Sequence, residues 1–385
     1  MNNKNTYLVT GGAGFIGTNF VKLLSREEPE ARIVVIDALT YCGNIKSIAG
    51  EIESGAITFV KGDICDRELV SELLDTYRPE YLVNFAAESH VDRSLTDSQP
   101  FVTTNVGGTL NLLDCARNQR DAQKAAGEIP TLRRFVQIST DEVYGDLDID
   151  IPEGKALPPE LCAALQRGAE SRLYGSDSFG ETSPLRPSSP YSAAKASADL
   201  MVLAYQHSFG LPVCITRCSN NYGPYQHPEK LIPLMINNIL ERKPLPVYGS
   251  GLNVRDWIHV EDHARGILAA AHHGREGEVY NFGGYNERRN IDIVRLLISS
   301  VAAQVSDNTG MDESLIRYVN DRPGHDRRYA IDAAKSMAEL GWKPLIPFDS
   351  GIADTVRWYL SNRKWLDDIV SGDYSTYYDR MYSNR

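Results

Sequence analysis

Five residues of this chain could together carry out acid–base chemistry and a redox step. Thr140, Asp141 and Glu142 are consecutive in the segment FVQISTDEVYG, and Tyr191 and Lys195 follow about fifty residues later in SPYSAAKASAD. A phenol and an ammonium at i and i+4 project from one face of a helix. Two neighbouring carboxyl groups can serve as acid and base if their environments separate their pKa values. A simple dehydrogenase would not need that carboxyl pair.

We expect Lys195 to lower the pKa of the Tyr191 phenol, because a nearby positive charge favours the phenolate. Tyrosine could then take a proton from a sugar hydroxyl near neutral pH. The pattern Y-x-x-x-K alone arises often by chance on exposed helices. It gains weight here because it follows a glycine-rich loop and a strand that ends in Ser-Thr.

Asp141 and Glu142 also have a structural interpretation, in which they cap the sheet edge with side chains on opposite faces, as in a regular strand. We favour catalysis, because open α/β sheets bind their ligands at the carboxyl ends of the strands. Tyr144 and Gly145, which follow, are expected to serve packing and the turn.

A dinucleotide site is indicated by TGGAGFIG at residues 10–17, which follows one apolar run and opens a helix. Its glycines permit a tight turn and close approach of the backbone to a pyrophosphate, and the helix N-terminus favours the phosphates. Asp37 ends the second strand twenty residues after Gly17, where a carboxylate accepts from a ribose 2′-hydroxyl and repels a 2′-phosphate. NAD is therefore favoured over NADP. Asp63 is in a position to accept a hydrogen bond from the adenine amino group. It could equally cap the helix that follows.

The elements that position these residues alternate between strands and helices. Apolar runs predict strands at 6–11, 32–37, 57–63, 81–89 and 133–140, and periodic segments predict helices at 15–26, 68–77 and 104–117. This alternation specifies an α/β fold of the Rossmann type, a doubly wound parallel sheet with helices on both faces. The stretches 118–132 and 146–187 interrupt it.

The second interruption, 146–187, contains an expected helix near 158–170 and is either a lid or a solvated insertion. From residue 214 the pattern becomes mixed, with helices expected at 231–242, 261–273, 291–304 and 350–362. We therefore divide the chain into 1–213 and a smaller α/β lobe at 214–385. The boundary is approximate, because strands of the second part can return to the first.

Composition excludes several classes of function. The 385 residues carry a net charge of -11, which argues against nucleic acid, whose phosphates demand a basic surface. No apolar run approaches the roughly 20 residues that span a bilayer, and the N-terminus does not resemble a signal peptide, so we expect a cytoplasmic protein. The cysteines at 42, 65, 115, 162, 214 and 218 include no C-x-x-C pair, and the histidines have no metal-ligand spacing. No metal is expected, and Cys214 and Cys218 should be buried free thiols.

The chain resembles the extended short-chain dehydrogenase/reductase family over nearly its whole length. The resemblance is carried by TGGAGFIG, DALTYCGN, KGDICD, NFAAESHVDRS, STDEVYGDL, SPYSAAKASAD, RCSNNYGPYQHPEKLIPLMI, NVRDWIHVEDHARGI, NERRNID and DRPGHDRRYAID. STDEVYG and DRPGHDRRYAID match the members that dehydrate a nucleoside-diphosphate glucose. The chain departs from their pattern at Ala38, at His227 and in the insertion after Gly145, which affects loop details and not the reaction.

This resemblance implies an NAD-dependent hydro-lyase with dTDP-glucose as the favoured substrate. Tyr191 would take the proton of the sugar 4-hydroxyl while hydride leaves C4, and Thr140 would hold O4. Glu142 would then remove the C5 proton, and Asp141, or an acid that it serves, would protonate the departing 6-hydroxyl. Return of hydride to C6 leaves a 4-keto-6-deoxy sugar.

The resemblance assigns cofactor binding to residues 1–213 and nucleotide-sugar binding to residues 214–385. Carried over residue by residue, it also implies two sets of contact residues. The cofactor set is Gly11, Gly14, Phe15, Ile16, Gly17, Asp37, Leu39, Thr40, Asp63, Ile64, Phe85, Ala86, Ala87, Ser89, Thr104, Tyr191, Lys195 and Asn221. The substrate set is Ser89, Thr140, Glu142, Asn220, Lys230, Leu231, Pro246, Tyr248, Arg255, Asn290, Arg322 and His325. The two arginines offer planar forks that suit a diphosphate.

Other functions stay open at this point. An NAD-dependent nucleotide-sugar 4-epimerase of the same fold would not need the carboxyl pair, and a decarboxylase would need a carboxylated substrate. A catalytically silent NAD-binding regulator predicts loss of the Tyr/Lys or Asp/Glu positions, which are intact. Thymine and uracil differ by one methyl group and are not distinguished. A homodimer is expected from the resemblance, through a four-helix bundle of segments 104–117 and 197–209, unless both helices pack only within the chain.

Overall fold

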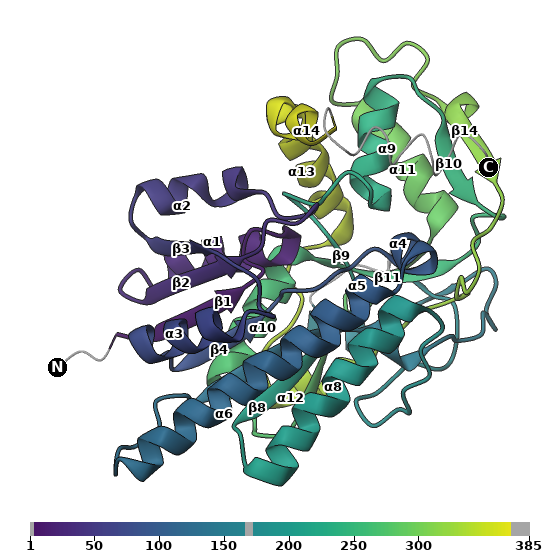
Figure 1. Ribbon diagram of the computed structural model, residues 1–385. Helices are drawn as coiled ribbons and strands as arrows, with labels where there is room; N and C mark the ends of the chain where they lie inside the picture. Colours follow the sequence, from purple (N-terminus) through teal and green to yellow (C-terminus); the bar gives the residue numbers. More distant parts are fainter. Residues whose placement is uncertain (1–3, 166–171, 371–385) are drawn as a thin grey trace.

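The computed structural model describes residues 4–165 and 172–370 (Figure 1). A seven-stranded sheet lies at its centre, in the order β12-β8-β5-β4-β1-β2-β3, and every neighbouring pair is parallel. Its strands are β1 (Thr6–Thr10), β2 (Arg32–Asp37), β3 (Ile57–Lys61), β4 (Tyr81–Asn84), β5 (Arg134–Thr140), β8 (Val213–Cys218) and β12 (Val279–Phe282). The expected Rossmann-type doubly wound fold is thus confirmed, with its strand order reversing between β1 and β4.

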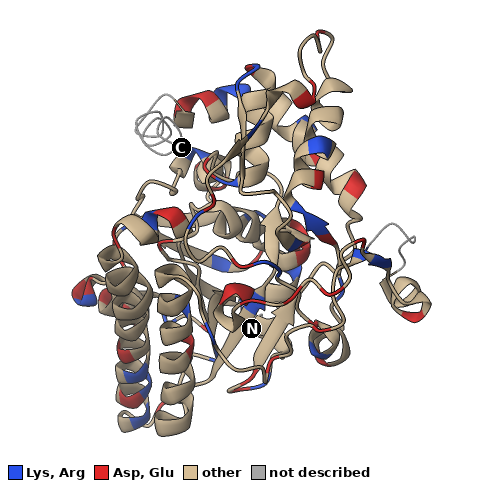
Figure 2. Ribbon diagram, turned by 90° about the vertical axis from the view of Figure 1, so that its right-hand side faces the viewer, with Lys and Arg blue, Asp and Glu red and all other residues tan. Residues whose placement is uncertain are grey.

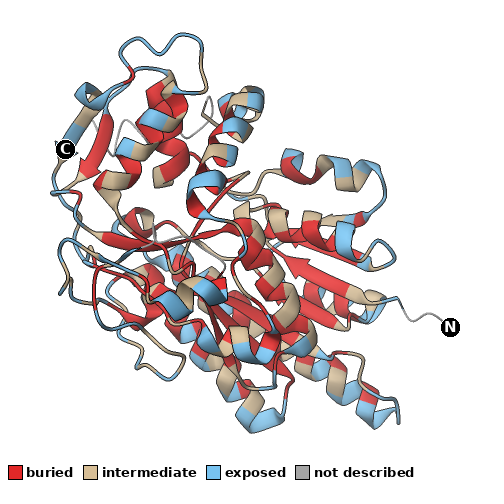
Figure 3. Cartoon of the chain, turned by 180° about the vertical axis from the view of Figure 1, so that it is seen from behind, coloured by how far each residue is buried: buried red, intermediate tan, exposed pale blue. Residues whose placement is uncertain are grey.

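Helices cover both faces of this sheet. Val9 packs with α1 (Phe15–Glu27) and α10 (Val260–His273), whereas its neighbour Leu8 packs with the helices of the other face. Those helices are α3 (Arg67–Tyr77), α6 (Thr109–Ala125) and α8 (Pro190–Phe209). Figure 3 shows the strands between them as buried. Burial on both faces explains why the strands read as continuous apolar runs.

The second lobe is built around two smaller sheets. One has the order β6-β7-β13-β11-β9, and the other pairs β10 with β14 in parallel. Their strands are β6 (Lys155–Ala156), β7 (Arg172–Leu173), β9 (Asn220–Tyr222), β10 (Leu245–Tyr248), β11 (Val254–His259), β13 (Glu287–Arg289) and β14 (Ile316–Val319). The lobe packs α9 (Leu231–Leu240), α11 (Asn290–Ala302), α13 (Phe348–Ser361) and α14 (Arg363–Ile369) around its own apolar cluster, at the top of Figure 1.

The two parts of the chain are not contiguous in sequence. Strands β8 and β12 and helix α10 follow the expected boundary at residues 213 and 214, yet they complete the large sheet and its covering layer. The insertion at 146–187, conversely, adds β6 and β7 to the sheet of the second lobe. Its helix α7 (Pro159–Leu165) begins near the expected position, and residues 166–170 of that expectation lie outside the described residues.

Some expected boundaries were wrong. Helix α6 continues to Ala125, through half of the stretch 118–132 that was expected to interrupt the alternation. This half is rich in polar helix formers, which leave no apolar periodicity although the backbone stays helical. Helices α12 (Ala334–Leu340) and α14 were not expected. The remaining short turns are α2 (Ala49–Glu53), α4 (Val91–Thr96), α5 (Gln99–Phe101), η1 (Ile45–Ile48), η2 (Val102–Gly108), η3 (Asp141–Tyr144) and η4 (Glu313–Leu315). None of the helices in the described ranges is long and apolar enough to cross a membrane.

Candidate active site

A cavity of about 330 Å³ lies at the carboxyl ends of the central strands. It is lined by the glycine loop, the ends of β2, β3, β4, β5 and β8, and the first turn of α9. All expected cofactor residues except Leu39 line it, together with all five expected catalytic residues. Leu39 packs instead against the apolar cluster beneath. One cavity therefore brings together the dinucleotide loop, the tyrosine–lysine pair and the carboxyl pair.

The glycine loop packs against neighbouring backbone so closely that side chains at two of its positions would clash. A Cβ on Gly11 would lie 2.6 Å from the Ala86 nitrogen, and one on Gly17 would lie 2.2 Å from the Gly11 oxygen. Gly14 is the N-cap of α1, so the first amides of that helix stay open to an anion. These observations fit a bound dinucleotide.

Asp37 is held at the end of β2 by two backbone amides. Its carboxylate accepts from the Ala13 nitrogen at 2.9 Å and the Leu39 nitrogen at 2.8 Å, one on each oxygen. Each oxygen keeps a further acceptor site for a ribose hydroxyl. Burial raises the pKa of this carboxyl, and the two amides oppose that rise. Asp63 also lines the cavity, and it does not cap α3, because Asp66 accepts from the Leu69 nitrogen there.

The carboxyl pair lies on a tight turn and not on a strand. The chain leaves β5 at Thr140, whose hydroxyl accepts from the Glu142 nitrogen at 3.3 Å, and then forms η3. Strand alternation therefore ends before Asp141, and both carboxyl groups line the cavity. Asp141 is 1% exposed, and among the described residues its Oδ2 has no hydrogen-bond partner.

The two carboxyl groups have different electrostatic surroundings. Burial raises the pKa of Asp141 well above its ordinary value, and the charges of Glu142 and Asp256 raise it further. Burial also raises the pKa of Glu142, but Arg322, Lys230 and Arg255 lower it. Asp141 is therefore suited to carry a proton, whereas Glu142 is suited to accept one.

The tyrosine–lysine pair lies on the first two turns of α8, as expected, but the expected effect of lysine on the phenol was wrong. Lys195 donates from Nζ to the Ile138 oxygen at 2.7 Å, and burial lowers the pKa of this amine to about 8. The pKa of Tyr191 is raised well above its ordinary value by burial and then by Glu142, and a hydrogen bond with Thr140 opposes this. Burial and negative neighbours outweigh the ammonium.

Tyr144 and Gly145 serve packing and the turn, as expected. Tyr144 is buried, donates to Asn281 at 2.8 Å and accepts from Arg217 at 3.0 Å. Arg217 is paired with Asp199 of α8 at 2.9 Å. Gly145 has a φ of 96°, and a Cβ there would lie 2.4 Å from the Arg186 oxygen. The turn that carries Asp141 and Glu142 therefore packs against residues of α8 and of the insertion.

The expected substrate residues fall into two groups. Ser89, Asn220, Lys230 and Leu231 line the cavity beside Thr140 and Glu142. Pro246, Tyr248, Arg255, Asn290, Arg322 and His325 lie outside that lining, on elements of the second lobe. Among these, the charges of Arg255 and Arg322 lower the pKa of Glu142. The rings of Tyr248 and His325 pack edge to face, with their centroids 6.1 Å apart.

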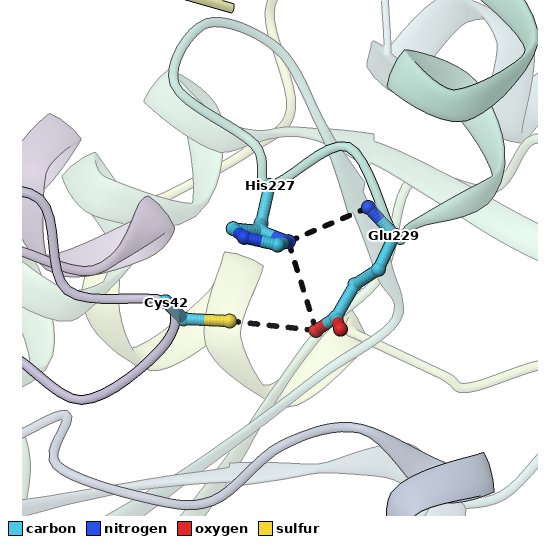
Figure 4. Close-up of side chains that lie close together, drawn as sticks. All are labelled: Cys42, His227 and Glu229. Atoms are coloured by element: carbon cyan, nitrogen blue, oxygen red, sulfur yellow. Dashed lines mark hydrogen bonds and ion pairs between the residues drawn. The ribbon is translucent and has the colours of Figure 1, made fainter. Parts of the chain in front are cut away.

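Sequence spacing did not reveal one polar cluster beside the cofactor loop. Cys42, His227 and Glu229 come together from two distant segments, and their potential ligand atoms lie within 4.8 Å of one another (Figure 4). The Cys42 thiol donates to Glu229 at 3.4 Å, while Arg93 pairs with the same carboxylate at 3.2 Å. Burial lowers the pKa of His227 to about 3. Because a guanidinium already neutralises Glu229, we assign this cluster to hydrogen bonding between the two segments and not to a metal.

Comparison with known proteins identifies the relatives of this chain. Residues 7–283 match the model of the NAD dependent epimerase/dehydratase family. A dTDP-glucose 4,6-dehydratase of Salmonella typhimurium is 46% identical over 379 residues, covering 98% of this chain and 99% of the relative. One of Xanthomonas campestris pv. campestris is 48% identical over 374 residues, covering 96% and 97%.

Solved structures point the same way. DesIV, a dTDP-glucose 4,6-dehydratase of Streptomyces venezuelae crystallised with NAD, superimposes with a TM-score of 0.80 at 43% identity. The superposition covers 94% of this chain and 99% of DesIV.

Proposed function

The chain belongs to the NAD dependent epimerase/dehydratase family, and from this we propose that it is a dTDP-glucose 4,6-dehydratase, a hydro-lyase that uses NAD. The observation that carries the proposal is the buried Asp141–Glu142 pair in the same cavity as the dinucleotide loop and Tyr191. Loss of water from a sugar needs both a proton acceptor and a proton donor. In this cavity the pKa values of both groups are raised by burial, but nearby carboxylates raise that of Asp141 further, whereas nearby cations oppose the rise at Glu142.

The residues of the chain would divide the work as follows. Tyr191, next to the Thr140 hydroxyl, is assigned the proton of the sugar 4-hydroxyl, a role in which the positive charge of bound NAD would have to offset the raised pKa of the phenol. Bound NAD supplies the hydride acceptor for C4 and returns the hydride to C6. Glu142, held ready by the cations around it, removes the C5 proton made acidic by the 4-ketone. Asp141, kept protonated by burial, gives its proton to the departing 6-hydroxyl.

A 4-epimerase or a decarboxylase of the same fold is the alternative, and the carboxyl pair argues against the first. An epimerase exchanges hydride on the two faces of one carbon and eliminates nothing, so a protonated Asp141 would have no task. The relatives from Salmonella typhimurium and Xanthomonas campestris are named as dehydratases, which favours the same choice.

Product analysis tests the function. The purified protein is incubated separately with dTDP-glucose, UDP-glucose and GDP-mannose, and each mixture is analysed by mass spectrometry. We expect loss of one water from dTDP-glucose without net formation of NADH, because the hydride returns to the product. An isomer of unchanged mass would indicate an epimerase, and stoichiometric NADH would indicate an ordinary dehydrogenase.

A homodimer in the cytoplasm completes the proposal. Helices α6 and α8 lie side by side at the edge of the molecule (Figure 1), where α8 exposes Leu200 (58%) and η2, which leads into α6, exposes Val102 (52%). Exposed apolar side chains on paired helices suit a four-helix interface. All six cysteines are unpaired, which suits a reducing compartment. Light scattering that gave a monomer mass at micromolar concentration would refute the dimer.

No nucleic-acid partner is proposed. The net charge is -11, and acidic and basic residues alternate along the ribbon in Figure 2, which does not favour binding to phosphates of a nucleic acid.

A further inference from the structure

Asp92 is a buried carboxylate that the proposed reaction does not use. It lies on α4, directly after the segment Phe85–Ser89 that lines the cavity, and its side chain is 4% exposed. A carboxylate so deep in the protein must be neutralised by partners, because burying a lone charge costs several kcal/mol. The identity of those partners indicates what the residue does.

Two side chains of the second lobe bind the Asp92 carboxylate. The Tyr248 hydroxyl donates to Oδ2 at 2.9 Å, and Nη1 of Arg322 lies 3.3 Å from Oδ1. Tyr248 ends β10, and Arg322 follows β14, which is the strand paired with β10. One carboxylate of the cofactor-binding part therefore holds two side chains at adjacent strand ends of the substrate-binding part.

Arg322 keeps donors for a further ligand. Its side chain is 16% exposed, and among the described residues its Nε is buried without a hydrogen-bond partner. Arg322 also contributes the largest cationic influence on Glu142. The guanidinium is thus paired with Asp92, lowers the pKa of the proposed base Glu142 through its charge, and has a buried donor left over. An incoming diphosphate would complete this arrangement.

Arg255 provides the contrast. Its guanidinium donates to the Val254 and Asp326 backbone oxygens and lies 4.2 Å from the centre of the Tyr329 ring. Within the described ranges it has no carboxylate partner at ion-pair distance. Its position is set inside the second lobe, whereas that of Arg322 depends on a group in the other part of the protein.

We propose that Asp92 is a positioning residue for the nucleoside-diphosphate end of the substrate, acting through Arg322 and Tyr248. This inference rests on the proposed function for its substrate. It predicts that substrate binding and the relative placement of the two lobes are linked, because the diphosphate anchor is complete only when α4 meets the ends of β10 and β14.

The test compares Asp92→Asn with the parent enzyme in its NAD-bound form. We expect KM for dTDP-glucose and the Kd of dTDP to rise together by about 10- to 100-fold, as for a truncated buried charge pair. The value of kcat should change less, by up to about threefold, because Lys230 and Arg255 still act on Glu142 and Tyr191 is untouched. Bound NAD should be unchanged. Asp97→Asn, an exposed aspartate at the end of the same helix, is the matched control and should behave like the parent.

Tyr248→Phe is the second variant, because it removes one hydrogen bond without leaving Asp92 unneutralised and should fold even if Asp92→Asn does not. We expect a smaller rise in the Kd of dTDP, about 3- to 10-fold, and less than additive effects in the double variant. An unchanged Kd in both variants, or a fall in kcat at constant Kd, would overturn the inference. The binding of dTDP is measured without turnover, so failure of the parent enzyme to dehydrate dTDP-glucose would refute the function and leave this test intact.

Discussion

Replacing Asp141 by Asn should damage the reaction and stabilise the protein at once. Losing a general acid typically costs 10²- to 10⁴-fold, or about 2.7 to 5.5 kcal/mol of barrier. Elimination should fall by that factor, while oxidation at C4, which depends on Tyr191, should persist. Reduced cofactor should then accumulate in a single turnover, which its absorbance reports, and mass spectrometry should show little dehydrated product.

The stability change follows from the raised pKa of the Asp141 carboxyl. A carboxyl group whose pKa is higher in the folded than in the unfolded protein contributes stability that depends on pH. This contribution is fully present below the pKa of the unfolded state, which is about 3.9. That stabilisation is lost as pH rises from there through the folded-state pKa, at about 1.4 kcal/mol for each pH unit that separates the two pKa values. At neutral pH the parent has lost part of it, because the unfolded chain is ionised while the folded carboxyl still holds its proton, whereas an amide of the same shape has nothing to lose. The Tm of Asp141→Asn should therefore exceed that of the parent at neutral pH, with the difference shrinking towards pH 4.

Asp177→Asn, an exposed residue of the insertion, is the control and should change neither quantity. If Asp141→Asn formed product at the parental rate, Asp141 would not be the acid. If it instead lowered the Tm at neutral pH, the carboxyl would be ionised and stabilising in the folded protein, and the assignment of roles within the pair would have to be reversed.

Three further predictions concern the other parts of the site and the assembly. Tyr191→Phe should slow oxidation and elimination together by about 10²- to 10⁴-fold in single-turnover assays, and retention of the first step would exclude the phenol as its base. Asp37→Asn should weaken NAD binding to reconstituted apo-protein by roughly 1.5 to 3 kcal/mol. It should also improve NADP binding, because it removes the charge that repels a 2′-phosphate, and unchanged rejection of NADP would show that Asp37 only anchors the loop. Leu200→Glu should convert the dimer to a monomer in light scattering, and an unchanged mass would place the interface elsewhere.

Most of the fold and the chemical groups of the site were predictable from the sequence because they follow from short-range patterns. The glycine loop, the apolar runs and the Tyr191–Lys195 spacing each lie within one or two elements, so their geometry follows from strand and helix periodicity. The same reasoning misplaced the end of α6, because a solvent-exposed helix end carries no apolar pattern to reveal it. It allowed strands of the second part to return to the first, but it did not identify β8 and β12 as those strands.

The sequence by itself determined which groups are present and that they meet at the carboxyl edge of a parallel sheet. Only the tertiary structure decided their protonation and their partners. Lys195 donates to the Ile138 oxygen, burial raises the pKa of Asp141, and Asp92 pairs with Arg322, which lies 230 residues away in the chain. The physical reason is that pKa values and hydrogen-bond partners depend on burial and on charges brought close by the fold, and spacing along the chain carries no record of either.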